Sequence, residues 1–320
     1  MSASAPVKAP RFASVDALRG LTVAAMLLVN NPGDWGHVYA PLLHAGWHGC
    51  TPTDLVFPFF LFIVGVSIAL GVVPRLEAGA SRGALVRTLA ARALRIVGLG
   101  LLLHLLAWWW LDMAHFRPWG VLQRIGLCFL AAGAVALWLA PRTQWLLLGG
   151  LLLGWWALLA WGGSLAPWDN LASRVDTALL GPWLYQFDPA TGRGHDPEGL
   201  LSTLGALATT LFGVRAGDWL RHGRRRALWI AAVGSLLLGL LWATVLPWNK
   251  HLWTPSYVLW SGGWAMLALA AAHVLVDRRG WPALGRSFGV NAIAAYAGSA
   301  VMVYAVAALG WWEAIYRIGF

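Results

Sequence analysis

The chain has 320 residues, of which 59% are hydrophobic and only 11% are charged, and its formal net charge is +10 at pH 7. Soluble globular domains carry about 25% charged residues, so this composition excludes an ordinary soluble protein and indicates a membrane protein. The positive charge alone would allow a nucleic-acid partner, but its distribution along the chain, described below, does not favour one.

Apolar segments that approach the length of a membrane span recur along the whole chain. A helical span needs about 20 mostly apolar residues, and nine segments come close to this: Val15–Asn31, Leu55–Val73, Ala93–Leu111, Ile125–Ala140, Trp145–Trp161, Leu200–Leu220, Ala227–Leu246, Tyr257–Val276 and Val290–Leu309. Lipid offers no partner for a free backbone amide, and the alternating pattern of a barrel is absent, so helices are predicted. The predicted fold class is an all-α polytopic membrane helix bundle that forms one domain over residues 1–320.

Basic residues gather on one side of the predicted bundle. With the polar segment MSASAPVKAPRF in the cytoplasm, 16 of the 23 Lys and Arg residues fall on the cytoplasmic side. This asymmetry predicts a cytoplasmic N-terminus and accounts for the net charge without nucleic acid. No Ala-x-Ala cleavage site follows the segment, so the first apolar run is expected to be a retained helix and not a signal peptide.

Polar side chains cluster where the first apolar segment ends and the second begins. Asn30 lies at the end of the first, and the loop HAGWHGCTPTD leads through His44, His48 and Asp54 into the second. A histidine can accept and donate protons near neutral pH, although a loop histidine bonded to a backbone carbonyl is the alternative. The side chain of Thr53 or Asp54 can cap the second helix, Asp54 can also orient a histidine, and the two roles are compatible.

No metal site is predicted at this loop. His44 and His48 have the spacing of helical metal ligands, but Gly46 and Gly49 argue against a helix, and no third ligand accompanies them. The sequence also lacks a P-loop, a Gly-x-Ser-x-Gly elbow and a His-Glu-x-x-His motif. Nucleotide hydrolysis, serine hydrolase chemistry and zinc proteolysis are therefore not supported.

Two predicted external loops carry further polar groups. The largest loop, Gly162–Gly199, is locally acidic, and the segment VLPWNKHLWTPSY places Asn249, Lys250 and His251 beside Trp253. These groups would lie on the same side of the membrane as the His44 loop.

Three further features of the sequence are a charged residue in an apolar segment, a pair of opposite charges and two cysteines. Arg124 opens the fourth apolar segment, where a cation costs about 3 kcal/mol unless it is paired, and the alternative is an arginine that snorkels to the interface. Asp16 and Arg19 lie three residues apart on one helical face, which predicts an ion pair. Cys50 and Cys128 lie near predicted helix ends on one side, and the sequence leaves open whether they pair.

Six segments in order resemble the transmembrane acetyltransferase family typified by heparan-α-glucosaminide N-acetyltransferase. They are SVDALRG with LLVNN, HAGWHGCTPTDLVFPFFLFIVGVSI, GVLQRIG, DPEGLLSTLGALATTLFGVRAG, NKHLWTPSYVL and GVNAIAAY, which together extend from about Ser14 to Tyr296. The resemblance implies about nine to eleven spans. The missing luminal extension of the animal enzyme implies a bacterial member in the inner (cytoplasmic) membrane.

The resemblance also implies a reaction: transfer of an acetyl group from cytosolic acetyl-CoA to the amine of a terminal glucosamine across the membrane. His44 matches the active-site histidine of the family, Asn30 an asparagine beside it, and Asp54 a motif position. Substrate contacts are expected from Asn249, Lys250, Trp47 and Trp253, and contacts to acetyl-CoA from Arg124, Arg19, Arg221, Arg224 and Arg225. The expected partners are an amino sugar or oligosaccharide, membrane lipids and a second copy of the chain in a homodimer.

The chemistry fits this expectation and leaves alternatives. His44 can accept the proton of the attacking amine or become transiently acetylated. The Asn30 amide can hold the developing oxyanion, a contact worth about 3 kcal/mol in other enzymes. The alternatives are an O-acyltransferase for an envelope glycan and a non-enzymatic amino-sugar permease. Polar groups at the outer helix ends, and not at the midplane, favour chemistry over transport.

Overall fold

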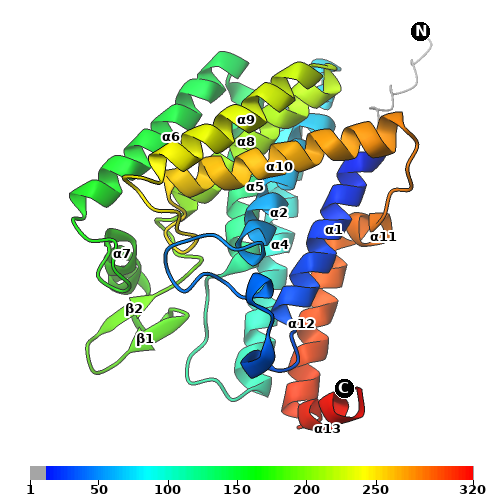
Figure 1. Ribbon diagram of the computed structural model, residues 1–320. Coiled ribbons are helices and arrows are strands. Elements are labelled where there is room, and N and C mark those ends of the chain that lie inside the picture. The colour runs from blue at the N-terminus through cyan, green and yellow to red at the C-terminus, as the bar shows by residue number, and fades with distance from the viewer. Residues whose placement is uncertain (1–11, 320) are drawn as a thin grey trace.

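The computed structural model describes residues 12–319 and is mostly helical (Figure 1). Its elements in chain order are α1 (Ala13–Asn30), α2 (Val56–Gly71), α3 (Val73–Glu77), α4 (Arg82–Trp110), α5 (Val121–Trp138), α6 (Pro141–Trp161), α7 (Leu171–Leu180), β1 (Gln186–Asp188), β2 (Arg193–His195), α8 (Thr203–Arg221), α9 (Arg225–Trp242), α10 (Pro255–Ala272), α11 (Arg286–Val290), α12 (Ala292–Ala308) and α13 (Trp312–Gly319). A turn of 3₁₀ helix, Thr53–Leu55, leads into α2, and a π-helical stretch, His273–Arg278, extends α10. Lys8 and Arg11 of the predicted cytoplasmic segment lie outside the described residues.

All nine apolar segments predicted from the sequence are helices, namely α1, α2, α4, α5, α6, α8, α9, α10 and α12. They run back and forth between two ends of the bundle. We call one the hairpin end, because β1 and β2 lie there, at the lower left of Figure 1. The other is the arginine end, which carries the turns α3–α4, α5–α6 and α8–α9.

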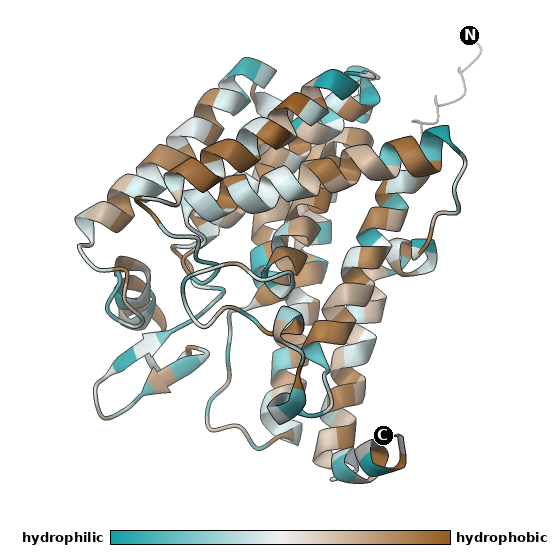
Figure 2. Cartoon of the chain, in the orientation of Figure 1, coloured by the Kyte–Doolittle hydropathy of each residue, from teal (hydrophilic) through white to brown (hydrophobic). Residues whose placement is uncertain are grey.

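Seven of these helices, among the described residues, are long and apolar enough to cross a membrane: Ala13–Asn30, Thr53–Glu77, Arg82–Trp110, Val121–Trp138, Pro141–Trp161, Arg225–Trp242 and Pro255–Arg278. Figure 2 shows hydrophobic residues along these helices and hydrophilic residues at many helix ends and loops. Helix α12 is apolar but has 17 residues. The chain is therefore a multi-pass membrane protein, while the count of nine to eleven spans and the side of the N-terminus stay predictions.

Helix α8 lies in the interior of the bundle, which explains its lower apolarity. Fourteen of its 19 residues are buried, and it packs closely along α2. The contact depends on glycines, because a Cβ atom built on Gly65 would lie 1.9 Å from the Thr210 carbonyl oxygen, and one on Gly213 would lie 1.9 Å from the Phe62 carbonyl oxygen. A helix surrounded by protein does not need an apolar surface against lipid, so polar residues are tolerated in α8.

Three expectations about local structure can be compared directly with the fold. The predicted ion pair between Asp16 and Arg19 is confirmed, at 3.2 Å. The all-α prediction misses an antiparallel hairpin, in which Phe187 pairs with Gly194, inside the segment expected to be a long loop. That segment also contains α7. The two thiols are free, with Cys128 buried and Cys50 half-buried.

Candidate active site

His44 and Asp54 form the centre of a polar site at the hairpin end. His44 Nδ1 lies 2.7 Å from Asp54 Oδ1, and Asp54 is 1% exposed. The second carboxylate oxygen accepts hydrogen bonds from the amides of Ala45 and Thr51, both at 3.0 Å, and from the Thr51 hydroxyl. A carboxylate at Nδ1 keeps the proton of a neutral imidazole on that nitrogen, so Nε2 is the acceptor nitrogen of the ring.

Asp54 does not cap the second helix. Neither the turn Thr53–Leu55 nor α2 has a side-chain cap hydrogen bond, and the Thr53 hydroxyl donates to the Pro41 carbonyl instead. The capping role predicted for this pair is therefore wrong. The reason is that the Asp54 carboxylate binds amides of the preceding loop, which folds back over the helix end.

A cavity of about 420 Å³ opens beside His44, and we call it the His44 pocket. Its lining comes from seven parts of the chain: Met26, Val29 and Asn30 of α1; His44, Ala45 and Gly46; Thr53, Val56 and Phe57; Val121; Tyr185, Pro197 and Glu198; Lys250 and His251; and Tyr296 of α12. Asn30 is exposed, and no described residue hydrogen-bonds its side-chain amide. The structure thus brings Asn30, His44 and Lys250 to one cavity.

Lys250 is the closest cation to His44. Its Nζ lies 3.2 Å from both ring nitrogens of His44 and 3.9 Å from Asp54 Oδ1. Burial lowers the pKa of Lys250. Asn249, next in the chain, is fully buried and does not line the pocket: its side-chain oxygen accepts from the Leu252 amide at 2.8 Å, so it shapes the loop that presents Lys250.

The two tryptophans expected to contact substrate lie behind the pocket wall. Trp47 stacks on His251 with ring centroids 5.0 Å apart, and its indole N–H donates to the Leu165 carbonyl. Trp253 is fully buried and packs edge-on against Phe57 at 5.2 Å. In this arrangement both support residues that line the pocket and do not line it themselves.

A pair of histidines extends the site away from His44. His195 Nε2 lies 3.0 Å from His251 Nδ1, and His195 Nδ1 lies 3.0 Å from the Ser173 hydroxyl. Burial lowers the pKa of His195 to about 3 and that of His251 to about 4, so both are neutral at pH 7. Sequence reasoning missed His195, and its only signal was its place beside two acids in HDPE.

Arg124 does not snorkel to an interface. The side chain is fully buried: Nη2 donates to the Gly199 carbonyl at 2.8 Å and to the Ser202 hydroxyl at 2.6 Å, and the guanidinium lies 5.1 Å from the centre of the Trp253 ring. The snorkelling alternative is therefore wrong. Arg124 ties α5 to the chain that leads into α8, close to Glu198 and away from solvent.

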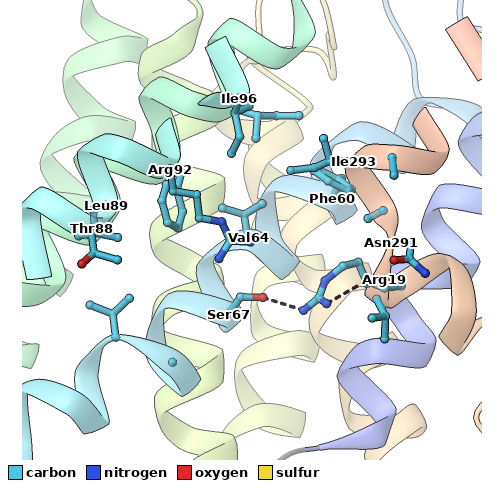
Figure 3. Close-up of a pocket in the computed structure, with 18 of the residues that line it drawn as sticks. Arg19, Phe60, Val64, Ser67, Thr88, Leu89, Arg92, Ile96, Asn291 and Ile293 are labelled. Carbon is cyan, nitrogen blue, oxygen red and sulfur yellow. Dashed lines mark hydrogen bonds between the residues drawn. The ribbon is translucent and has the colours of Figure 1, made fainter. Parts of the chain in front are cut away.

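A second cavity, of about 540 Å³, lies toward the arginine end, and we call it the Arg19 pocket (Figure 3). Arg19, Arg75 and Arg92 line it. Arg19 donates to the Ser67 hydroxyl at 2.9 Å, and the Arg92 guanidinium lies 5.3 Å from the centre of the Phe129 ring. Three cations in one cavity form a site that suits phosphate groups.

The remaining arginines expected to bind acetyl-CoA lie elsewhere. Arg221 forms ion pairs with Glu77 at 2.6 Å and with Asp218 at 3.0 Å. Arg224 lies in the turn between α8 and α9, and Arg225 begins α9; both are exposed, and neither lines the Arg19 pocket.

The two pockets lie end to end along the same helices. In α2 and the turn before it, Thr53 and Phe57 line the His44 pocket, while Phe60, Val64 and Ser67 line the Arg19 pocket. The spacing of three and four residues places all of them on one helical face. Helices α1, α5 and α12 repeat the pattern with Asn30 and Arg19, Val121 and Ile125, and Tyr296 and Ile293.

No three His, Cys, Asp or Glu side chains are grouped as a metal site within residues 12–319. Together, the fold and these cavities define a polytopic helical membrane protein with a histidine–aspartate site at one end and a basic cavity toward the other. Comparison with known proteins gives the family. The sequence model of the catalytic region of heparan-alpha-glucosaminide N-acetyltransferase matches residues 11–183, which is just over half of the chain.

Two relatives extend this match. The chain is 30% identical to human heparan-alpha-glucosaminide N-acetyltransferase, over 91% of this chain and 53% of the human protein. It is 28% identical to the mouse protein of the same name, over 92% of this chain and 54% of that protein. The chain belongs to the heparan-alpha-glucosaminide N-acetyltransferase family, and it spans about half the length of these curated relatives.

Proposed function

We propose that this chain is a membrane acetyltransferase that moves an acetyl group from acetyl-CoA to the amine of a glucosamine-type sugar. The observation that carries the proposal is the His44–Asp54 pair, joined at 2.7 Å, on the wall of a cavity about 420 Å³ in volume. Family membership supports the reaction class, since both matched relatives are named as N-acetyltransferases.

His44 acts in this proposal as a general base. An amine attacks a thioester only as the free base, so a proton must leave the nitrogen as the new bond forms. Asp54 holds His44 Nδ1–H, so Nε2 is the nitrogen that accepts that proton once the amine replaces Lys250 Nζ, which lies 3.2 Å from it. A transient acetyl group on Nε2 is the second route by which the same geometry can work.

Asn30 supplies the hydrogen-bond donor for the oxyanion in the proposed site. Its amide lies on the wall of the His44 pocket with no hydrogen bond to a described residue. An unoccupied donor there can stabilise the oxyanion that forms when the amine adds to the acetyl carbonyl. Asp54 orients the base, and Lys250 balances the negative charge of Asp54.

Acetyl-CoA fits the Arg19 pocket better than the arginines of the α8–α9 turn. Its phosphates need several cations that face one cavity, which Arg19, Arg75 and Arg92 supply together. The helical face from Arg75 to Thr53 is about 33 Å long at 1.5 Å per residue, comparable to the bilayer core. The pantetheine arm would follow this face toward His44.

The proposed sidedness follows from the arginine asymmetry. The arginine end faces the cytosol, where acetyl-CoA is made, and the hairpin end faces the opposite side, where the sugar is bound. In a bacterium this is a multi-pass protein of the inner membrane with its acceptor in the periplasm.

The test is acetyl transfer from labelled acetyl-CoA to glucosamine by the purified, reconstituted protein. His44→Ala is expected to lower the rate by about 10²–10⁴-fold, as removal of a general base does. The matched control is His48→Ala, because His48 lies in the same loop and is exposed but does not line the His44 pocket.

Three results would contradict the proposal. Glucosamine uptake into vesicles without acetylation would support a permease. Acetylation of a sugar hydroxyl in preference to the amine would support an O-acyltransferase. Full activity of His44→Ala would remove His44 as the base.

A further inference from the structure

Glu198 presents a carboxylate oxygen to the His44 pocket. It lies just after β2 and lines the cavity, with an exposed fraction of 8%. Its Oε2 accepts a hydrogen bond from Arg117 Nη2 at 2.8 Å. No described residue hydrogen-bonds Oε1, and this oxygen keeps some accessible surface. One half of the carboxylate is therefore paired, and the other is available to a molecule in the pocket.

The position of Glu198 is fixed by a network of charges. Arg117 binds Asp196 through Nε at 3.0 Å and through Nη2, and it stacks on Tyr185 at 4.8 Å. Asp196 in turn accepts from the backbone amides of Glu198 at 2.9 Å and Tyr185 at 3.1 Å. This network joins the hairpin to the pocket wall, so the carboxylate is held without the help of a ligand.

The charge state of Glu198 is also determined by its neighbours. Burial alone would raise its pKa, but the positive charges of Arg117 and Arg124 outweigh this effect and lower the pKa of Glu198. Glu198 is thus an anion at neutral pH. A ligand that fills the pocket would cover Oε1, and a donor on that ligand would offset the cost of removing this oxygen from water.

We propose that Glu198 binds the amino group of the acceptor and makes the site prefer an amine over a hydroxyl. The inference rests on the proposed function and deepens it. A charge-assisted N–H···O bond to an ammonium group is stronger than a bond to a neutral hydroxyl. An acceptor without the amine leaves the carboxylate poorly paired, and such unmet buried groups give the largest discrimination between substrates.

The proton and electron balance is that of ordinary acyl transfer. The bound ammonium loses one proton to water, the nitrogen lone pair attacks the thioester carbonyl, and His44 Nε2 accepts the second proton as the amide forms. The carbon–sulfur bond breaks, and coenzyme A leaves as a thiolate that takes the proton from His44 Nε2. Glu198 keeps its hydrogen bond to the remaining N–H throughout.

The first test compares Glu198→Gln with the wild-type protein in acetyl transfer. Gln keeps the volume and an oxygen for Arg117 but removes the charge. The KM for glucosamine is expected to rise at least tenfold, with the KM for acetyl-CoA unchanged. The matched control is Asp169→Asn, which removes one negative charge from the same acidic segment at an exposed position that does not line the pocket.

The second test is a binding measurement that does not depend on catalysis. Calorimetric titration with glucosamine is expected to show at least tenfold weaker binding by Glu198→Gln, while binding of glucose changes less than twofold. Equal weakening for both sugars, or no weakening for glucosamine, would overturn the inference. Because wild-type protein that binds but does not acetylate glucosamine would contradict the proposed function alone, the two failures are distinguishable.

A third variant covers the case in which Glu198→Gln does not fold. Glu198→Asp keeps the charge on a shorter side chain. It is expected to weaken glucosamine binding and still bind glucosamine more tightly than glucose. Loss of that preference in a folded Glu198→Asp protein would also overturn the inference.

Discussion

Asp54 is the residue around which the site is organised. Four donors reach its carboxylate: the His44 ring, the amides of Ala45 and Thr51, and the Thr51 hydroxyl. Its backbone carbonyl accepts from the buried Tyr257 hydroxyl at 2.6 Å. One side chain therefore holds the loop in place and orients His44, because a carboxylate has two oxygens that can serve different parts of the chain.

At the same scale, His195 makes stability depend on pH. Its pKa is about 3 in the folded protein and about 6.5 in an unfolded chain. Between these values the unfolded chain binds a proton that the folded chain does not. The free energy of unfolding is therefore at its full value above pH 6.5 and falls as the pH is lowered toward 3. The loss is about 1.4 kcal/mol for each pH unit below 6.5.

The measurement is thermal unfolding in detergent between pH 7.5 and pH 5, compared with His195→Gln. The variant is expected to be less stable at pH 7.5 and to lose less stability on acidification, because glutamine does not titrate. If the unfolding temperature of the two proteins fell by the same amount between pH 7.5 and pH 5, His195 would not contribute to the pH dependence.

At the scale of elements, α2 contacts both pockets and the interior helix α8. One of its faces lines the cavities, while another packs against α8 at Gly65 and Gly213. Small residues allow helix backbones in a membrane protein to approach closely and gain van der Waals contact. The position of the pocket-lining face therefore depends on the glycine contact behind it.

Gly65→Val tests this contact. The added Cβ would lie 1.9 Å from the Thr210 carbonyl oxygen, which belongs to backbone and cannot move alone. A loss of at least 3 kcal/mol is expected, the upper end of the usual range for overpacking. The matched control is Gly149→Val in α6, where nothing lies within 4 Å of a Cβ. Thermal unfolding and monodispersity in detergent check the result, and equal stability of the two variants would contradict it.

At the scale of the molecule, the bundle holds a basic cavity and a histidine site in line between the same helices. The proposed reaction needs this arrangement, because a phosphate-bearing donor and a sugar acceptor approach from opposite sides of a membrane. The position of Arg19, Arg75 and Arg92 around the Arg19 pocket predicts where the donor binds.

The double variant Arg75→Gln with Arg92→Gln is expected to raise the KM for acetyl-CoA at least tenfold and leave the KM for glucosamine unchanged. A charge-assisted hydrogen bond contributes about 1.5–3 kcal/mol, which corresponds to a factor of ten or more. The control is Arg224→Gln with Arg225→Gln, which removes two exposed charges of the same end. If the control raised the KM for acetyl-CoA and Arg75→Gln with Arg92→Gln did not, the phosphates would bind at the α8–α9 turn.

Much of the fold could be predicted from local sequence patterns. The nine apolar segments are helices, and the pair Asp16–Arg19 forms as expected. The predictions for Arg124 failed because its partners are distant in the chain, whereas the capping prediction at Asp54 failed because the loop folds back onto the carboxylate. The sequence leaves open that Arg124 snorkels to an interface, because its partners Gly199 and Ser202 are about 75 residues away in the chain.

The sequence by itself determined the class of fold, the asymmetry of charge and the proximity of His44 to Asp54, ten residues apart, because these depend on hydrophobicity and short spacings. Only the tertiary structure decided that Glu198 and His251 share a cavity with His44, and that Arg19, Arg75 and Arg92 meet in another. These groups lie on helices and loops far apart in the sequence. What brings them together is the packing of the bundle, and no local pattern in a single sequence encodes those contacts.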